Sequence, residues 1–226
     1  MIDKRVRDLA AAVDGIADGA SVMVGGFGSV GQPDALVEAL IEQGARNLTL
    51  IANNAGAGRV GVAKLLEARR VSKIICSFPR SAGSVIFEEL FKAGEIALEI
   101  VPQGTLAERI RAAGAGIGAF YTPTAFGTRL AENKETREID GRQYVLEHAL
   151  PADVALVEAW RADRWGNCVY RKSGRNFNAI MATAAKLTIV QTQQIAELGE
   201  IDPEAVVTPG IFVNRVVHVP YGNPKS

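Results

Sequence analysis

Four short apolar runs alternate with helical patterns through the first half of this 226-residue chain. The runs are rich in β-branched residues and cover Val22–Val24, Leu48–Ala52, Val71–Ser77 and Ile96–Val101. Apolar residues at helical spacing follow each run, over residues 33–43, 60–68, 85–92 and 106–113. Because parallel neighbouring strands need a crossover that is usually helical, this order predicts an α/β fold with an open, mostly parallel sheet and helices on both faces.

The second half of the chain has a different pattern, which predicts antiparallel additions to that sheet. Thr136–Glu147 is typical of a hairpin with a type I′ turn at Asp140-Gly141. Val154–Trp160 and Cys168–Tyr170 predict a second antiparallel pair. The other expected elements are a helix over 6–16 with Asp3 as its cap, a closely packed glycine-spaced segment over 115–120, a helix over 177–186, and strands over 187–191 and 211–219. No linker is evident, so we expect residues 1–226 to form one domain.

The charge balance argues against two classes of partner. Lys plus Arg and Asp plus Glu each number 25, and no basic block occurs. Nucleic acids and anionic membranes are bound by excess positive charge, so we expect neither as a main partner. The charged N-terminus does not resemble a signal peptide and no apolar run is long enough for a membrane span, which predicts a soluble, cytoplasmic protein.

The cysteines and histidines indicate no metal or nucleophilic centre. Cys76 and Cys168 lie far apart in apolar patterns and are expected to be small buried hydrophobic residues. His148 and His218 belong to no metal-binding or catalytic-triad arrangement. We therefore expect no metal site.

A glycine-rich turn follows the first predicted strand and precedes a helix that opens at Pro33. The turn consists of Gly25, Gly26, Phe27, Gly28, Ser29, Val30 and Gly31. Glycines let a ligand approach the main chain closely, and backbone N–H groups at a helix N-terminus attract negative charge. The turn is therefore suited to an anionic group of a ligand, or to an oxyanion formed during a reaction.

Two other interpretations of this turn stay open at this point. Gly26–Gly31 also fits the dinucleotide fingerprint G-x-G-x-x-G, which would make the chain a nicotinamide-dependent oxidoreductase. That fingerprint needs an acidic residue at the end of the second strand, where this sequence has Asn53-Asn54. The turn could also connect a strand to a helix without binding any ligand.

Polar side chains follow the predicted strands at their carboxyl ends, where ligands bind in open α/β sheets. Asn53 and Asn54 follow the second strand, Ser77–Arg80 the third and Gln103 the fourth. We expect these loops and the glycine turn to meet at one edge, where amides and a guanidinium would bind an acid or its thioester. The sequence offers no nucleophile elbow, phosphate-binding loop or obvious base there, so the chain is either a binding module or half of an enzyme completed by another chain.

The turn and helix start from Gly25 to Pro33 resemble the G-G-F-x-x-x-G-x-P signature of the α (A) subunits of family I coenzyme A (CoA) transferases. Further stretches that resemble these subunits in the same order are Asn53–Gly56, Pro102–Arg111, Gly141, Asn176-Phe177 and Thr208–Val213. Within the family, Cys76–Arg80 and the segment over 134–147 are most similar to the group that acts on 3-oxoadipate. The group that acts on acetoacetate is the alternative.

The resemblance implies transfer of CoA from succinyl-CoA to a 3-oxo acid, with 3-oxoadipate placing the chain in the β-ketoadipate pathway of aromatic catabolism. CoA thioesters are then substrates, and no permanently bound cofactor is expected. The family's nucleophile is a glutamate in a Ser-Glu-Asn-Gly motif on the B subunit. This chain has no such motif, so the resemblance implies a heteromer whose partner B subunit carries the catalytic residue.

The resemblance also implies roles for residues. The turn from Gly25 to Gly31 would bind CoA, while Asn53, Asn54 and Gln103 would donate hydrogen bonds to a substrate carboxylate or developing oxyanion. For Arg80 we add a hypothesis of our own. Succinate and 3-oxoadipate are dicarboxylates, and a guanidinium binds a carboxylate in a two-pronged geometry.

Overall fold

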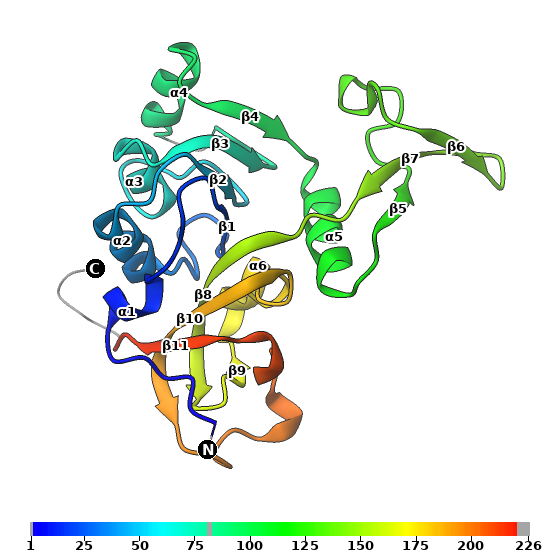
Figure 1. Cartoon of the computed structure of the whole chain (residues 1–226). Coiled ribbons are helices and arrows are strands. Elements are labelled where there is room, and N and C mark those ends of the chain that lie inside the picture. Colours follow the sequence, from blue (N-terminus) through cyan, green and yellow to red (C-terminus); the bar gives the residue numbers. More distant parts are fainter. Residues whose placement is uncertain (1, 81–82, 221–226) are drawn as a thin grey trace.

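The structure is a computed structural model that describes residues 2–80 and 83–220 (Figure 1). Its main sheet consists of β1 (Ser21–Val24), β2 (Leu48–Ile51), β3 (Val71–Cys76), β4 (Ala97–Ile100), β8 (Ala152–Asp163), β9 (Cys168–Val169), β10 (Ala185–Ala196) and β11 (Arg215–His218). The strand order is β11-β10-β8-β1-β2-β3-β4, and all of these neighbours are parallel. The short strand β9 pairs with β8 in the antiparallel direction. The predicted α/β fold with a mostly parallel sheet is confirmed.

Helices cover both faces of this sheet, as expected from the alternating pattern. The helices are α1 (Leu9–Val13), α2 (Asp34–Gln43), α3 (Val62–Glu67), α4 (Val85–Lys92), α5 (Gln103–Gly114) and α6 (Asn176–Met181). Helices α1 to α4 pack on one face, and α5 and α6 pack on the other (Figure 1). No helix of the described part of the chain is both long and apolar enough to cross a membrane.

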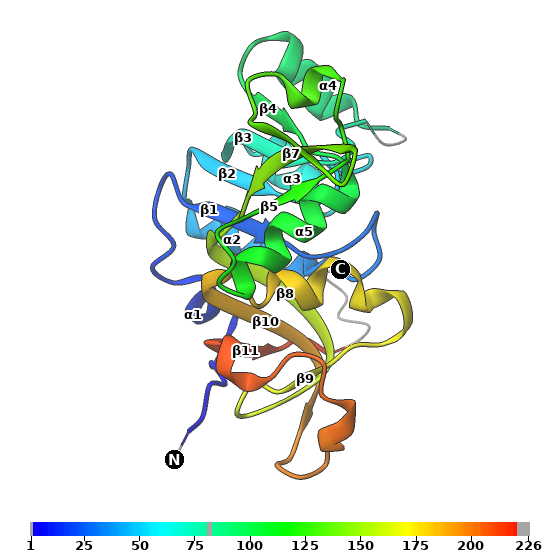
Figure 2. The ribbon, with the colours of Figure 1, turned by 90° about the vertical axis from the view of Figure 1, so that its right-hand side faces the viewer.

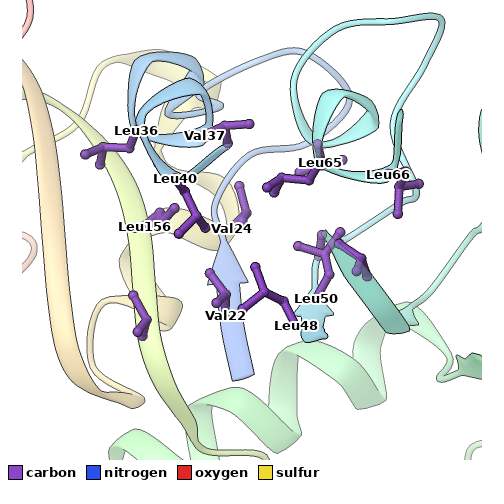
Figure 3. Close-up of a cluster of buried hydrophobic side chains, with 14 of the residues drawn as sticks. Val22, Val24, Leu36, Val37, Leu40, Leu48, Leu50, Leu65, Leu66 and Leu156 are labelled. Carbon is purple, nitrogen blue, oxygen red and sulfur yellow. The ribbon is translucent and has the colours of Figure 1, made fainter. Parts of the chain in front are cut away.

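The buried side chains form one hydrophobic cluster on each face of the sheet. Val22 and Val24 of β1 point toward α2, where they meet Leu40 (Figure 3). Met23, between them, points to the opposite face and belongs to the cluster that includes Leu106 of α5. This alternation follows from the two-residue period of a strand, and it explains why these strands are apolar at almost every position.

The second half of the chain differs from the prediction in one important respect. Strand β8 pairs with β9 only near its end, and its main partners are β1 and β10, both parallel to it. Val154, for example, lies opposite Val22 on one side and Leu187 on the other. The segment 152–163 is buried on both faces, as expected for a central strand rather than for an added hairpin.

The predicted hairpin is confirmed and belongs to a separate small sheet. Strands β5 (Ala119–Thr122), β6 (Thr136–Ile139) and β7 (Arg142–His148) form an antiparallel sheet in the order β5-β7-β6. Asp140 and Gly141 have φ values of 50° and 74°, as a type I′ turn requires. Figure 1 shows this sheet projecting to one side of the molecule beyond α5, and Figure 2 looks at the molecule from that side.

Helix α5 connects the small sheet to the main one. Arg109 of α5 donates from Nε to the carbonyl of His148 at 2.9 Å and from a guanidinium N–H to Glu99 of β4 at 3.1 Å. The backbone carbonyl of Arg109 also accepts a hydrogen bond from Leu150 N at 2.8 Å. The side chain of Arg109 thus reaches β4 of the main sheet and β7 of the small sheet at the same time.

Three local expectations are wrong. The helix expected over 177–186 ends at Met181, and β10 begins at Ala185. Asp3 does not cap the first helix, because its carboxylate is paired with Arg5 and Asp8 accepts from Ala11 N instead. The segment 115–120 is not closely packed, since a Cβ added at Gly116 or Gly118 would meet no atom within 4 Å. The glycines there belong to the exposed approach to β5.

Candidate ligand site at the carboxyl edge of the sheet

The glycine turn lies directly beyond the carboxyl end of β1. Gly25 N donates to Leu156 O of β8 at 2.9 Å, which continues the strand ladder into the turn. Phe27 and Val30 then exchange two backbone hydrogen bonds of 3.0 and 3.1 Å, so the turn folds back on itself. The side chains of Phe27 and Val30 remain 49% and 47% exposed. The tip of the turn is therefore accessible to a ligand.

The side-chain amides after β2 and β4 meet at the same carboxyl edge of the sheet. Asn53 Oδ1 accepts hydrogen bonds from Gln103 Nε2 and from Ser77 Oγ, both at 2.9 Å. Asn53 itself is only 6% exposed. Its side-chain oxygen Oδ1 accepts both of these hydrogen bonds, while its Nδ2 has no partner among the described residues. The expected gathering of these three loops is observed, and it leaves N–H donors of Asn53 and Gln103 available to a ligand.

Asn54 has a different local role from Asn53. Its Oδ1 accepts from Gly56 N at 2.8 Å, and its backbone pairs with Phe78 in an isolated bridge. A side chain that bonds the backbone two residues further on stabilises a turn. Asn54 therefore shapes the loop after β2, and this bond leaves its Nδ2 donors unused.

Arg80 lies apart from the amides. Its side chain is 72% exposed, and its Nε is 3.7 Å from Glu88 Oε1 of α4. Arg80 lines a cavity of about 500 Å³ together with Phe78, Phe87 and Ile100, and Ser77 lies on the wall of the same cavity. Ser77 also donates to Asn53, so it belongs both to the wall of this cavity and to the hydrogen-bonded group of Asn53 and Gln103.

Asn178 of α6 is a site residue that the sequence did not reveal. Its Nδ2 donates to Gly31 O at 2.8 Å and to Gly174 O at 2.9 Å, while its Oδ1 accepts from Glu158 N at 2.9 Å. A Cβ added at Gly25 would lie 1.9 Å from that Oδ1. Asn178 is fully buried and fixes the glycine turn from a position far away in the sequence, where no local pattern marks it.

Two carboxyl groups lie behind the turn and were also missed. Burial raises the pKa of Glu158, and it outweighs the opposing hydrogen bond that Gln193 donates to Oε1 at 2.8 Å. Burial raises the pKa of Asp34 as well, and its Oδ1 is buried without a hydrogen-bond partner among the described residues. In both cases burial disfavours the charged form of the carboxyl group.

The thiols offer no nucleophile. Cys76 and Cys168 are fully buried, as expected for small hydrophobic residues. Burial raises the pKa of the Cys76 thiol to about 12 and raises that of Cys168 further. Neither forms a thiolate at neutral pH. In the described part of the chain, no group of three His, Cys, Asp or Glu side chains is placed to hold a metal ion.

The site thus combines an accessible glycine turn with a pair of amides, and the described part of the chain adds neither a thiolate nor a metal centre. Residues 6–219 match the protein family described as coenzyme A transferase. The chain belongs to the coenzyme A transferase family. This membership confirms the resemblance found in the glycine motif, and the nicotinamide-dependent alternative gains no support.

Relatives cover the chain over nearly its full length. A protein from Pseudomonas putida, named as the A subunit of 3-oxoadipate CoA-transferase, is 61% identical over 97% of this chain and 95% of that protein. A protein from Xanthomonas campestris pv. campestris (strain B100), named as the A subunit of succinyl-CoA:3-ketoacid coenzyme A transferase, is 52% identical over 95% of this chain and 88% of that protein.

Solved structures support the fold. An acyl-CoA transferase (YdiF) from Escherichia coli O157:H7 matches 97% of this chain with a TM-score of 0.86 at 23% identity. The match covers 48% of that chain, so this protein spans about half the length of that relative. At this level of identity the likeness concerns the fold alone.

Proposed function

We propose that this chain is the A subunit of a two-subunit, cytoplasmic CoA-transferase that moves CoA from succinyl-CoA to 3-oxoadipate. The relative with 61% identity is named for 3-oxoadipate, whereas the 3-ketoacid relative is 52% identical. Acetoacetate is the alternative acceptor. In either case CoA thioesters are substrates, and the scheme requires no permanently bound cofactor.

The observation that carries this proposal is the Asn53–Gln103 amide pair at the carboxyl edge of the sheet. In the proposed reaction a glutamate carboxylate on the partner B subunit first attacks the thioester carbonyl, CoA leaves as thiolate, and a mixed anhydride remains. The thiolate then attacks the glutamyl carbonyl of that anhydride, which releases succinate and leaves a glutamyl-CoA thioester. The acceptor acid reverses these steps. Each attack places negative charge on a carbonyl oxygen, and fixed N–H donors stabilise such an oxyanion.

The residues of this chain would then bind and orient the reactants. Gln103 and Asn53 supply the side-chain donors, and the turn from Gly25 to Gly31 receives the CoA moiety. Asn54 acts indirectly, because it shapes the loop that carries Asn53. Arg80 would bind the distal carboxylate of a dicarboxylic substrate at the cavity that begins at Ser77. Glu88 is a weak competitor for Arg80, since their charges are 3.7 Å apart and exposed to solvent.

Co-expression with a candidate B subunit tests the proposal. The purified complex and the lone chain are compared for CoA exchange between succinyl-CoA and each of 3-oxoadipate and acetoacetate. We expect transfer only by the complex, with the higher kcat/KM for 3-oxoadipate. A higher kcat/KM for acetoacetate would establish the alternative acceptor. Transfer by the lone chain at the rate of the complex, or no transfer by either, would refute the division of labour.

A further inference from the structure

The glycine turn lacks charge, although the ligand proposed for it is strongly anionic. None of the residues from Gly25 to Gly31 is ionisable. CoA carries a pyrophosphate and a 3′-phosphate, and backbone N–H groups alone offer no countercharge to them. Positive side chains near the turn would have to provide it.

A basic segment lies against the turn. It comprises residues 171–175 and contains the exposed side chains of Arg171, Lys172 and Arg175. None of these three forms an ion pair with another described residue. Many cations elsewhere on the surface are paired, as in the contacts of Arg59 with Glu67 and of Arg111 with Glu108. The segment therefore presents uncompensated positive charge at the edge where ligands are expected.

Two asparagine side chains hold the basic segment to the turn. Asn178 Nδ2 bridges Gly31 O and Gly174 O at 2.8 and 2.9 Å. Asn176 Nδ2 likewise donates to Val30 O at 3.0 Å and to Ser173 O at 2.7 Å. Each amide thus touches both the turn and the basic segment. Because both bonds of each amide involve backbone carbonyls, the two loops keep a fixed separation.

A cavity of about 350 Å³ opens beside the contact between the two loops. Val30 and Gly31 line it from the turn, Arg171 and Lys172 from the basic segment, and Glu158 and Trp160 from β8. The guanidinium carbon of Arg171 lies 5.8 Å from the centre of the Trp160 ring, which steadies this side chain at the cavity wall. Glu158 in the same wall accepts a hydrogen bond from Gln193 Nε2 at 2.8 Å and forms no ion pair with Arg171 or Lys172.

We propose that the basic segment binds the phosphate groups of the CoA thioester whose acyl end reaches the Asn53–Gln103 amides. This inference rests on the proposed function and adds a subsite to it. Exposed cations beside a backbone turn can match phosphate oxygens by charge and by hydrogen bonds. The segment then contributes to binding of CoA but not to the chemical steps.

The test uses the complete two-subunit enzyme and the double variant Arg171→Gln/Lys172→Asn. Asparagine is chosen because Lys172 has a φ of 49°, which asparagine tolerates. We expect KM for succinyl-CoA to rise at least about tenfold with kcat changed less than about twofold, as for lost charge-assisted contacts made equally in the ground state and transition state. Arg46→Gln is the matched control, since Arg46 is an exposed cation that precedes β2 at the opposite edge of the sheet.

A truncated substrate separates phosphate binding from a structural effect. With succinyl-pantetheine, which has no phosphate, the double variant and the wild type should have equal kcat/KM. Succinyl-3′-dephospho-CoA then shows whether the 3′-phosphate or the pyrophosphate is bound. An unchanged KM for succinyl-CoA, or an equal loss with succinyl-pantetheine, would overturn the inference. A wild-type complex that transfers no CoA would instead refute the proposed function.

A second pair of variants keeps the inference testable if the double variant does not assemble. Arg171→Gln and Arg175→Gln each remove one exposed cation and no described ion pair. Each should raise KM for succinyl-CoA by about threefold or more and leave turnover of succinyl-pantetheine unchanged. No effect from either single variant would contradict a phosphate site at this segment.

Discussion

At the scale of single residues, hydrogen bonding decides which groups can meet a substrate. Asn53 uses its carbonyl oxygen for Ser77 and Gln103 and retains its N–H donors. Asn54 uses its oxygen for the loop. The three amides that the sequence grouped together therefore differ in their partners: Asn53 and Gln103 bond each other, whereas Asn54 bonds the backbone of its own loop.

Gln103→Ala should lower kcat of the two-subunit enzyme by about 100-fold to 1000-fold, because one oxyanion donor is worth roughly 3 kcal/mol of barrier. KM for succinyl-CoA should change less, since the contact strengthens as charge develops. Steady-state kinetics of the assembled enzyme measure both constants. Gln143→Ala, which removes an amide from the hairpin of the small sheet, is the control. A kcat within twofold of the wild type would exclude Gln103 as a donor.

Arg80→Ala should reduce the preference for a dicarboxylic acceptor by about tenfold, the usual value of one charge-assisted contact. The measured quantity is the ratio of kcat/KM for 3-oxoadipate to kcat/KM for acetoacetate. Arg137→Ala removes a cation of similar exposure from β6 and should leave the ratio unchanged. If both variants keep the wild-type ratio, Arg80 has no part in substrate choice.

At the scale of elements, the glycine turn depends on α6 as much as on its own sequence. Asn178 contacts Gly31 directly and occupies the space that a side chain at Gly25 would need. The turn is thus held in place by a helix that enters the fold about 150 residues later in the sequence. Local composition makes the turn possible, and packing of α6 fixes its position.

Gly25→Ala should destabilise the folded chain by about 1–3 kcal/mol, because its Cβ would lie 1.9 Å from Asn178 Oδ1 in a packed region. Gly118→Ala is the matched control, since a Cβ there would meet no atom within 4 Å and Gly118 does not have a positive φ. Urea unfolding of the two variants and the wild type gives the free energies. Equal stability of all three proteins would contradict the close approach of Asn178 to Gly25.

The elements that the sequence predicted well are those whose signals are local. Helix α4 has the predicted bounds, since its apolar stripe fills every turn and Gly94 follows it. Helix α5 begins at Gln103 rather than at Leu106, because its first turn carries no apolar residue. Strand β8 was assigned to an antiparallel pair because a tight turn follows it, whereas its burial on both faces depends on β1 and β10.

The candidate site could likewise be predicted only where it depends on local sequence and on strand order. The gathering of Asn53, Ser77 and Gln103 follows from the rule that parallel strands end at one edge, so it could be inferred from strand order alone. The contact between Asn178 and Gly31 joins segments that share no local pattern. The raised pKa of Glu158 depends on burial that only the folded sheet produces. Such features cannot be read from spacing in one sequence.

At the scale of the whole molecule, charged contacts around α5 add to the backbone hydrogen bonds that join the two sheets. Arg109 is mostly buried and lies between Glu99 of β4 and Glu147 of β7. Glu147 is 3% exposed and also accepts from Lys134 at 2.6 Å. Because buried carboxylates need compensating partners, the position of the small sheet depends on Arg109.

Arg109→Ala should lower the free energy of unfolding by about 2–4 kcal/mol, because it leaves Glu147 and Glu99 with one cation each and removes the bond to His148. Amide hydrogen exchange should accelerate most in β5, β6 and β7. Arg137→Ala, which breaks an exposed pair with Glu135 in the same sheet, should cost less than about 1 kcal/mol. A similar decrease in the free energy of unfolding for both variants would show that the Arg109 contacts stabilise the fold no more than an exposed ion pair does.

Helix α5 has 12 residues and is therefore a rod of roughly 18 Å, with Gln103 as its first residue and Arg109 near its middle. A tilt of the small sheet would be passed through Arg109 to this helix and would displace the side-chain amide of Gln103 at its N-terminus. A partner that binds the small sheet would therefore also change the position of the Gln103 side chain.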